Sequence, residues 1–524
     1  MIRKTNTIKL TGLNGVPLNV ECQISEGTGI HLVGLSDTAT KESLLRTITA
    51  MNSKRYHIPG KKININLTPT NLYKKGAIYD LPIALTCIAA SGQDNGRLAN
   101  LEKVMVCGEL GLDGCVRPID GVIQVVAMAI KMELDAVIIP NLNTREVMDF
   151  FADQIDVYCV NDLEEAIDAV KASENKEKNE LHISNRIAEE QRIQTETDRM
   201  NDENDNDNFD RYVNCHPVLR RALAISAAGG HNLLFLGIDH TKTGIYSTYI
   251  NSLRPELKRN EALTLAKLYS VSGRGEQWRR FSGNYKNGIR PLRNPFSSVS
   301  LANICADGDR KPGEISLANH GILLLDEIEN MRSITDNDLF IQIMKEKKVT
   351  IFSDPHSGVI SYPAEIQVVA NTTPIPNTNS LTELMEWKER IHVKLYDKMD
   401  LQLSEKIIHR AENENQNISF DTLKESVKKA FDRQVDRFDG LGIEIQKNAD
   451  MTIPQIAVYA KMSSAAKDAL EQAMDDSPFP FSEGACASVI RVARTIADMD
   501  DKDMINPEHI MEALSYRPAE MCQL

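Results

Sequence analysis

Three short, almost entirely apolar runs in the second half of the chain constrain its fold more than any other feature. They span Leu233–Leu236, Ile322–Leu325 and residues 367–370. Strands that are apolar on both sides are typical of the centre of a parallel sheet whose two faces are covered by helices. Helical stretches lie between the runs, as the crossovers of a parallel sheet require. We therefore predict a layered α/β domain in this part of the chain.

A strongly polar interval, residues 172–210, divides the chain. It ends in MNDENDNDNFD, which offers too little apolar surface to offset the entropy lost on ordering. We predict a first domain of residues 1–172, a charged flexible linker of residues 173–210, a core of residues 211–402, and a helical region of residues 403–524. Part of the linker, ELHISNRIAEEQRIQ, could instead form a short helix.

The two ends of the chain carry different signals. Before the linker, β-type runs such as KININL and DAVIIP alternate with helical stretches such as DLPIALTCIAASG, which indicates a mixed α/β domain. From residue 453 onward the pattern is helical, and Asn506 with Pro507 forms a favourable start for the last helix. The expected fold class is α/β with a helical C-terminal lid.

The composition excludes several classes of protein. Of the 524 residues, 42% are hydrophobic and 26% charged, as in ordinary globular proteins. The net charge of −14 argues against coating nucleic acid through bulk charge, although a local basic channel would not show in this sum. Nine scattered cysteines without a CxxC pair predict reduced thiols and no zinc site. We recognise neither a secretory signal nor a membrane span and expect a cytoplasmic protein.

Two adjacent acids follow the run Ile322–Leu325. In GILLLDEIEN they are Asp326 and Glu327. In ATPases with a phosphate-binding loop, the first such acid helps to hold Mg²⁺ and the second acts on the attacking water. The alternative is a buried strand that meets a helix whose first turn favours acids. The pattern alone supports both interpretations about equally.

The sequence FLGIDHTKTGIYS begins like a phosphate-binding loop. Gly237 follows an apolar run, and Lys242 and Thr243 stand about where such a loop holds its lysine and its Mg²⁺-binding hydroxyl. The glycine that should precede the lysine is absent. Loop glycines let N–H groups curl around phosphate with positive φ angles, and Asp239 and His240 do not reproduce that geometry cheaply. Because Asp239 also adds a negative charge, we predict that ordinary ATP binding is lost.

Longer segments of the chain resemble one family. RALAISAAGGHNLLFLG, KPGEISLANHGILLLDE, YPAEIQVVANTTPIPN and VIRVARTIADMD occur in an order and spacing similar to those of the magnesium-chelatase-like AAA+ ATPases, specifically the ComM branch. In the first domain, GIHLVGLSDTATKESLLRTITAMN and GELGLDGCVRPIDGVIQ agree. The resemblance covers nearly the whole chain except the linker. It implies a Lon-protease-like N-terminal domain, a P-loop AAA+ core, a helical lid and a hexameric assembly. It also implies ATP and Mg²⁺ as cofactors, with Asp326 at the metal, and ATP-driven DNA branch migration.

Several positions depart from the family pattern. Aligned on Gly237 without a gap, Thr243 and Gly244 take the places of the family's lysine and hydroxyl. With one deletion, Lys242 and Thr243 remain the functional pair in a shortened loop. Both alignments predict a damaged phosphate site.

Three further nucleotide contacts are also altered. The family's sensor asparagine falls at Thr373, with Asn371 two residues away as a misregistered substitute. Lys398 stands at the arginine finger, and its ammonium lacks the planar fork that spans a phosphoryl group. Gly484 replaces an arginine expected before the last helical segment. Because these changes occur together, lost selection for hydrolysis explains them better than separate drift.

Contacts with DNA are predicted to be few. The hairpin tip SDPHSG, residues 353–358, contains no lysine or arginine, so it would lose most phosphate contacts. NPFSSVS replaces the family's paired histidines. The basic stretch GRGEQWRRFSGNYKNGIRPLR, with Trp278, Phe281 and Tyr285, would either stack on single-stranded nucleic acid or form a solvated loop, which its acidic surroundings favour.

The first domain is not predicted to be a protease. Asp80 stands where the resemblance to Lon would place a nucleophilic serine, and the lysine expected after RPIDG is replaced within VIQV. A serine–lysine dyad needs both partners. The leading hypothesis is therefore a scaffold, a regulatory partner or an inactive subunit, as a homo-hexamer or beside an active paralogue. The alternative is an ATP-dependent DNA helicase that tolerates an unusual loop.

Overall fold

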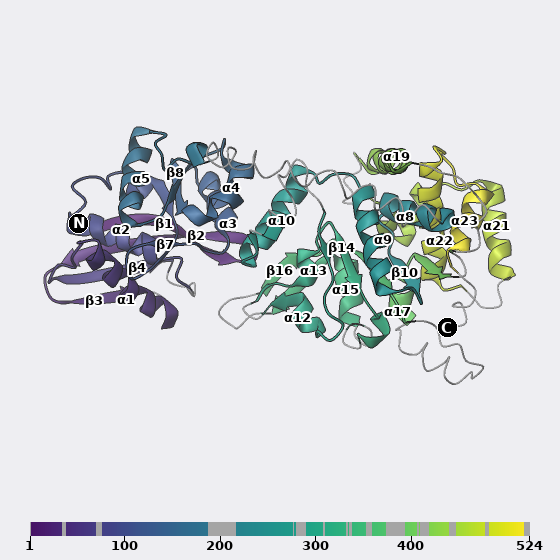
Figure 1. The fold of residues 1–524 in the computed structure, drawn as a ribbon, viewed down its shortest axis with the longest axis horizontal. Coiled ribbons are helices and arrows are strands. Elements are labelled where there is room, and N and C mark those ends of the chain that lie inside the picture. The colour runs from purple at the N-terminus through teal and green to yellow at the C-terminus, as the bar shows by residue number, and fades with distance from the viewer. Residues whose placement is uncertain are drawn as a thin grey trace.

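The computed structural model describes residues 2–33, 38–69, 76–186, 216–275, 277–278, 290–307, 310–331, 334, 338–352, 359–373, 393–405, 408, 419–439, 447–476 and 481–517. These residues form an elongated molecule (Figure 1). An α/β domain lies at the N-terminal end, a second α/β layer lies in the middle, and a group of helices lies at the far end. The α/β fold class and the C-terminal helices predicted from the sequence are confirmed.

The first domain is built on a seven-stranded mixed sheet. Its strand order is β3-β4-β2-β1-β5-β8-β9. Helices α1, α2 and α5 bury apolar side chains on one face of the sheet, and α3 and α4 cover the other. The elements are β1 (Ile2–Thr11), β2 (Asn14–Ser25), β3 (Gly29–Val33), α1 (Thr38–Ser53), β4 (Lys62–Thr68), α2 (Asp80–Ser91), β5 (Val104–Val106), β6 (Glu109–Leu110), β7 (Val116–Arg117), α3 (Val122–Lys131), β8 (Ala136–Pro140), α4 (Thr144–Phe151), β9 (Asp156–Val160) and α5 (Leu163–Asn175).

The ordered part of this domain extends beyond the boundary predicted at residue 172. That residue lies inside α5, which continues to Asn175. Leu181 and Ile183 are buried in the two cores of the domain, and the His182 ring packs edge-on against Tyr158. The first residues of the predicted linker are therefore part of the fold, and residues 187–210 lie outside the described part of the chain.

The second domain contains the parallel sheet predicted from the three apolar runs. Its strand order is β11-β14-β17-β10-β18, and all neighbours are parallel. All three runs are strands in its interior, and every residue of β10, β14 and β17 is buried. The strands are β10 (Leu233–Leu236), β11 (Leu292–Arg293), β14 (Ile322–Leu325), β17 (Gln367–Asn371) and β18 (Leu401–Ser404). The last strand spans the boundary predicted at residue 402.

Side chains alternate between the two faces of this sheet, as the strand period of two requires. Leu233 and Phe235 face α8, α9 and the C-terminal helices, whereas Leu234 and Leu236 face α12, α13 and α15. The sheet is thus covered on both sides. The helices and the hairpin of this domain are α8 (Pro217–Gly229), α9 (His240–Leu253), α10 (Arg259–Val271), α12 (Leu301–Cys305), α13 (Glu314–Leu317), α15 (Asp338–Glu346), β15 (Lys348–Phe352), β16 (Val359–Pro363) and α17 (Val393–Tyr396).

The C-terminal helices pack on α8 and share its hydrophobic core. His231, just before β10, joins them to the sheet: its Nε2 lies 2.7 Å from Thr495 Oγ1 and its Nδ1 lies 3.3 Å from Asp400 Oδ2. The helices are α19 (Phe420–Phe438), α20 (Ile453–Tyr459), α21 (Ser464–Asp475), α22 (Glu483–Met499) and α23 (Pro507–Ser515). No described helix has the length and apolar character needed to span a bilayer.

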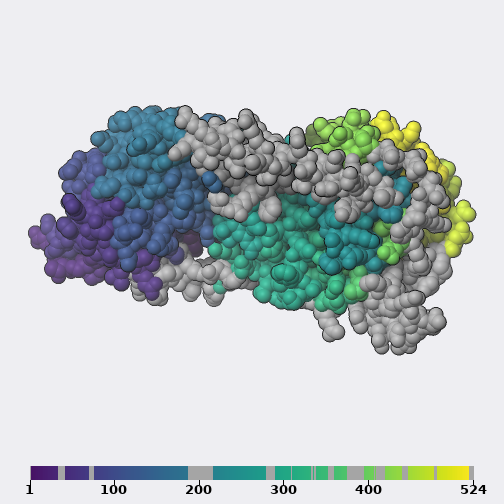
Figure 2. Space-filling model, viewed as in Figure 1, coloured from purple at the N-terminus to yellow at the C-terminus, as the bar shows by residue number. Residues whose placement is uncertain are grey.

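Helix α10 packs against the first domain. Its Leu265, Leu268 and Tyr269 belong to the same buried cluster as Ile123 and Phe150 of α3 and α4. The contact is also polar: Gly121 N donates to Ser270 O at 3.0 Å, and Lys311 Nζ lies 2.7 Å from Asp120 Oδ2. In the space-filling view the first domain lies directly against the second (Figure 2). The two domains therefore share a core, in addition to the linker that joins them in sequence.

A network of buried and partly buried charges lies at the amino edge of the five-stranded sheet. Arg290 Nη2 lies 3.3 Å from Glu261 Oε2, and Lys447, from the C-terminal region, places its Nζ 2.7 Å from Glu365 Oε1. His320 lies between them, 3.5 Å from Glu365. The Lys447 ammonium holds the pKa of Glu365 far below its usual range. Burial lowers the pKa of His320 to about 4, so this imidazole is neutral at pH 7.

Candidate nucleotide site at the carboxyl edge

The turn after β10 is only three residues long. Gly237 adopts a left-handed conformation with φ 73°, Ile238 and Asp239 follow, and α9 begins at His240. The end of β17 holds this turn in place: Gly237 N donates to Thr372 Oγ1 at 3.1 Å, and Asn371 Nδ2 donates to Ile238 O at 3.3 Å. A turn of this length has few N–H groups with which to surround a phosphate.

Asp239 caps the helix that follows. Its Oδ1 accepts a hydrogen bond from Thr241 N at 2.8 Å, and this bond holds the pKa of Asp239 below its usual value. The N-terminus of a helix attracts anions because its first N–H groups are unpaired and its dipole is positive there. A carboxylate of the chain itself therefore occupies the position that would favour a phosphate.

The two other loop residues of interest lie in the first turn of α9. Lys242 is exposed, and its ammonium makes no hydrogen bond or ion pair with the residues that the structure describes. Thr243 is fully buried, and its hydroxyl donates to Asp239 O at 3.1 Å. The Thr243 hydroxyl thus forms a bond within the helix, directed away from solvent.

The acids after β14 are held by amide side chains. Asp326 Oδ2 accepts a hydrogen bond from Asn294 Nδ2 at 2.7 Å, and its buried Oδ1 has no hydrogen-bond partner in the described structure. Glu327 has a left-handed backbone, φ 49°. Its N–H donates to Asn371 Oδ1 at 2.7 Å, and its Oε2 accepts from Asn330 Nδ2 at 3.0 Å. Asn371 therefore connects the turn after β14 with the turn after β10.

A third acid at this edge, Glu329, has no counterpart in the sequence predictions. It is 2% exposed, and its Oε1 accepts hydrogen bonds from the backbone N–H of Thr373, at 2.7 Å, and from the Thr373 hydroxyl. Thr373, predicted at a sensor position, thus binds a carboxylate of its own chain. The only signal for Glu329 in the sequence is the third acid of DEIEN, which resembles a solvated charge.

Lys398 and Gly484 both lie close to a further acid, Asp397. Lys398 is exposed in the turn after α17, and Gly484 lies in the first turn of α22. A Cβ atom on Gly484 would lie 3.6 Å from Asp397 Oδ2, which also accepts a hydrogen bond from Ser482 Oγ at 3.1 Å. The structure therefore brings the predicted finger position next to the start of α22, with Asp397 between them.

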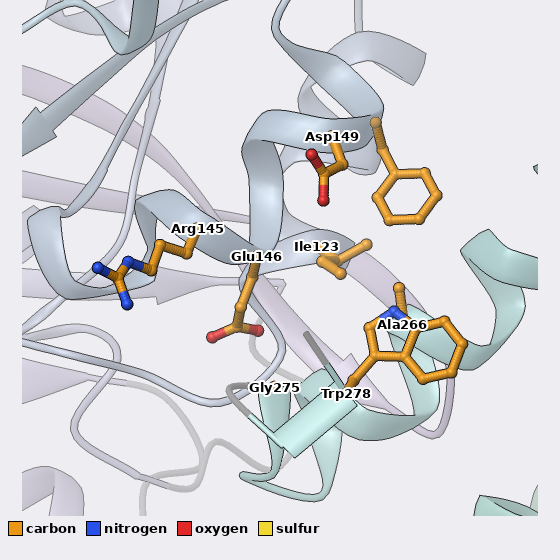
Figure 3. A pocket seen from close by; sticks show the side chains of 8 residues that line it. Ile123, Arg145, Glu146, Asp149, Ala266, Gly275 and Trp278 are labelled. Atoms are coloured by element: carbon orange, nitrogen blue, oxygen red, sulfur yellow. The ribbon is translucent and has the colours of Figure 1, made fainter. Parts of the chain in front are cut away.

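Trp278, the described aromatic residue of the basic stretch, is not exposed for stacking on nucleic acid and does not lie in a solvated loop. Trp278 is 6% exposed and packs on Tyr269, with ring centroids 5.4 Å apart. Figure 3 shows its indole beside Ile123 in the narrow space between the domains; only about 10 Å³ remains open there, roughly the space of one water. Arg293 pairs with Glu314. Phe281, Tyr285 and the tip 353–358 lie outside the described residues.

In the first domain, Asp80 has structural partners. It is fully buried at the start of α2. The Ser43 hydroxyl and Arg46 Nε, the latter at 3.2 Å, donate to its carboxylate, as does Leu110 N at 3.2 Å. Although these contacts oppose it, burial raises the pKa of Asp80. The segment VIQV lies in α3 and is buried.

Comparisons with known proteins cover almost the entire chain. Three family models match in order: "Subunit ChlI of Mg-chelatase" at residues 20–143, "Magnesium chelatase, subunit ChlI" at residues 211–414, and its C-terminal part at residues 418–517. An uncharacterized protein of Escherichia coli K12, YifB, is 32% identical, with 97% of this chain and 95% of the relative aligned. The competence protein ComM of Haemophilus influenzae is 30% identical over the same shares. An uncharacterized protein of Mycobacterium tuberculosis is 27% identical over 98% and 97%.

Proposed function

Because the chain belongs to the ComM branch of the magnesium-chelatase-like AAA+ family, we propose that it acts as a scaffold or regulatory subunit that does not hydrolyse ATP. The observation that carries this proposal is the capped turn of residues 237–239. To bind a nucleotide, α9 would have to unwind its first turn and displace the Asp239 carboxylate, which would otherwise lie against the phosphates. Like charges at such short range repel strongly.

The acids after β14 do not argue against this proposal. Asp326 and Glu327 have hydrogen-bond partners of their own chain, so their presence follows from the fold as readily as from catalysis. We propose that residues 211–402 remain an AAA+ assembly module. Members of the family commonly form hexamers, so this chain would join such a ring as a homo-hexamer or beside an active paralogue in the cytoplasm. DNA would bind weakly.

The test is the binding of a fluorescent ATP analogue, with and without Mg²⁺. The unmodified protein should show no binding up to about 1 mM, no ATP hydrolysis above background, and no rise in melting temperature with Mg-ATP. Lys242→Ala and Glu327→Gln should leave that background unchanged. Micromolar, Mg²⁺-dependent binding that Lys242→Ala abolishes would overturn the proposal.

A gain-of-function variant makes the test sharper. One glycine inserted between Thr241 and Lys242 converts GIDHTKT into the full phosphate-loop spacing. This variant should bind the analogue at least about tenfold more tightly than the unmodified protein. An alanine inserted at the same place is the matched control, because it restores the length without the conformational freedom of glycine. Equal behaviour of the glycine and alanine insertions would contradict a phosphate-loop origin.

The second candidate function is an ATP-dependent DNA helicase. It is favoured by two groups at the same edge that have no partner among the described residues, the ammonium of exposed Lys242 and Oδ1 of Asp326. This function requires DNA-stimulated hydrolysis that both Lys242→Ala and Glu327→Gln abolish.

A further inference from the structure

A polar cavity lies at the junction of the two domains, away from the carboxyl edge of the sheet. It is lined by Asn14 and Gly15 at the start of β2, by Gln124, Met128 and Lys131 of α3, and by Lys267 of α10. Its volume is about 200 Å³, whereas one water needs only about 10–15 Å³. The cavity can therefore hold a small molecule that touches both domains.

The charges around this cavity are of one sign. Lys131 and Lys267 both line it, and none of the described residues that line it is acidic, although the chain as a whole has a net charge of −14. Lys267 is partly buried, and burial lowers its pKa with no carboxylate opposing the shift. Lys131 ends α3, where a cation also suits the helix dipole. Lys267 lies in the middle of α10 and has no such explanation.

A hydrogen-bond acceptor in the same wall is also unsatisfied. Gln124 is 2% exposed, and its Nε2 donates to Lys267 O at 3.0 Å. Its buried Oε1 has no partner in the described structure. A buried acceptor without a donor costs free energy, so a ligand hydroxyl near the anionic end would complete the site once the Gln124 side chain turns its Oε1 toward the cavity.

We propose that this cavity, formed by Gln124, Lys131 and Lys267, binds a small phosphate monoester that carries a neighbouring hydroxyl group. The two ammonium groups attract the phosphate as point charges. The hydroxyl donates to Gln124 Oε1, and Asn14 lines the same cavity. Because Lys267 comes from α10 and the other residues from the first domain, the bound ligand joins the two domains.

The experiment measures binding to the full chain by calorimetry, with glycerol 3-phosphate as the probe and with inorganic phosphate and glycerol as partial probes. Glycerol 3-phosphate should bind more tightly than phosphate, and glycerol should not bind. Lys267→Gln and Lys131→Gln should each weaken the binding of glycerol 3-phosphate at least about tenfold. Lys171→Gln, on the exposed side of α5, is the matched control and should bind as the unmodified protein does.

Two further measurements separate a ligand site from a structural one. Gln124→Met should abolish the preference for glycerol 3-phosphate over phosphate, because it removes the acceptor. Without ligand, Lys267→Gln should not lower the melting temperature, since an unpaired, partly buried charge does not stabilise the fold. The proposal is overturned by absence of binding at millimolar concentration, by binding that survives both lysine substitutions, or by marked destabilisation of ligand-free Lys267→Gln.

Discussion

The two edges of the five-stranded sheet differ in the burial and pairing of their charged side chains. At the amino edge, Glu365 and Lys447 are partly buried and paired with each other across the junction with the C-terminal helices. At the carboxyl edge, Asp239 and Lys242 are exposed, and Glu327 binds an amide side chain. Charged side chains at the amino edge therefore stabilise the fold. Exposed charged side chains at the carboxyl edge do not, and they remain accessible to a ligand. An acid retained in a motif indicates catalysis only when it lacks structural partners of this kind.

The largest effect should come from breaking the ion pair at the amino edge. Lys447→Met leaves the partly buried Glu365 carboxylate without its main partner, which should lower the free energy of unfolding by about 3 kcal/mol. Urea denaturation followed by circular dichroism measures the loss. The double variant Lys447→Met/Glu365→Leu should recover most of it. Lys348→Met, which removes an exposed pair with Glu346, should cost at most about 1 kcal/mol; equal losses for the two single variants would remove the contrast between the edges.

A smaller effect should appear at the same edge when the pH is lowered. The pKa of folded His320 is about 4, whereas in the unfolded chain it is about 6.5. Below pH 6.5 the unfolded state takes up a proton that the folded state does not, so stability is full above that value and falls toward pH 4. Relative to His320→Gln, the unmodified protein should lose about 2–3 kcal/mol over this interval. Urea titrations at pH 7, 6 and 5 measure the difference, and parallel profiles would refute the assignment.

At the carboxyl edge, the buried acid should matter more than the motif acids. Glu329→Ala leaves the N–H and hydroxyl of Thr373 without their acceptor and should cost about 2 kcal/mol of unfolding free energy. Glu327→Ala, at an exposed position two residues earlier, is the control and should cost clearly less. Both are measured by urea denaturation, and a larger loss for Glu327→Ala would reverse the interpretation of this turn.

The smallest effect should come from the helix cap. Asp239→Ala removes the acceptor for Thr241 N, so the melting temperature should fall, but by less than in Glu329→Ala. Mg-ATP should not restore it, because the turn is still too short to hold phosphate. If Asp239→Ala alone gains ATP binding in a thermal-shift titration, the carboxylate and not the length of the turn is what excludes the nucleotide.

The sequence predicted the layers better than the contacts between them. A four-residue apolar run such as Ile322–Leu325, repeated twice more between helical stretches, is typical of a strand in the interior of a parallel sheet, so its position in the fold could be predicted. The apolar face of α10, with Leu265 and Leu268, shows that the helix is covered but not by which partner. The partner is α3 of the first domain, more than 100 residues away in sequence.

The candidate site was predictable in position but not in detail. Strand ends place Asp326 and Glu327 at the carboxyl edge, and the missing glycine indicates a damaged loop. The early start of α9 and the cap by Asp239 depend on hydrogen bonds that spacing alone does not specify. Glu329 was missed because a charged residue in an acidic run resembles a solvated one, and Trp278 was misjudged because its basic neighbours suggested an exposed loop.

The shared core around α10 has a consequence for how this chain could be exchanged with its relatives. A hybrid joined at residue 172, or anywhere in residues 187–215, would place a foreign first domain against Leu265, Leu268 and Tyr269. Those side chains are fitted to Ile123 and Phe150, so most such hybrids should fold poorly. Proteolytic cleavage of the backbone within residues 187–215 should likewise leave the two fragments bound to each other. The part of the chain that must be exchanged as one piece is thus the first domain together with α10, although a segment of more than 70 residues separates them in the sequence.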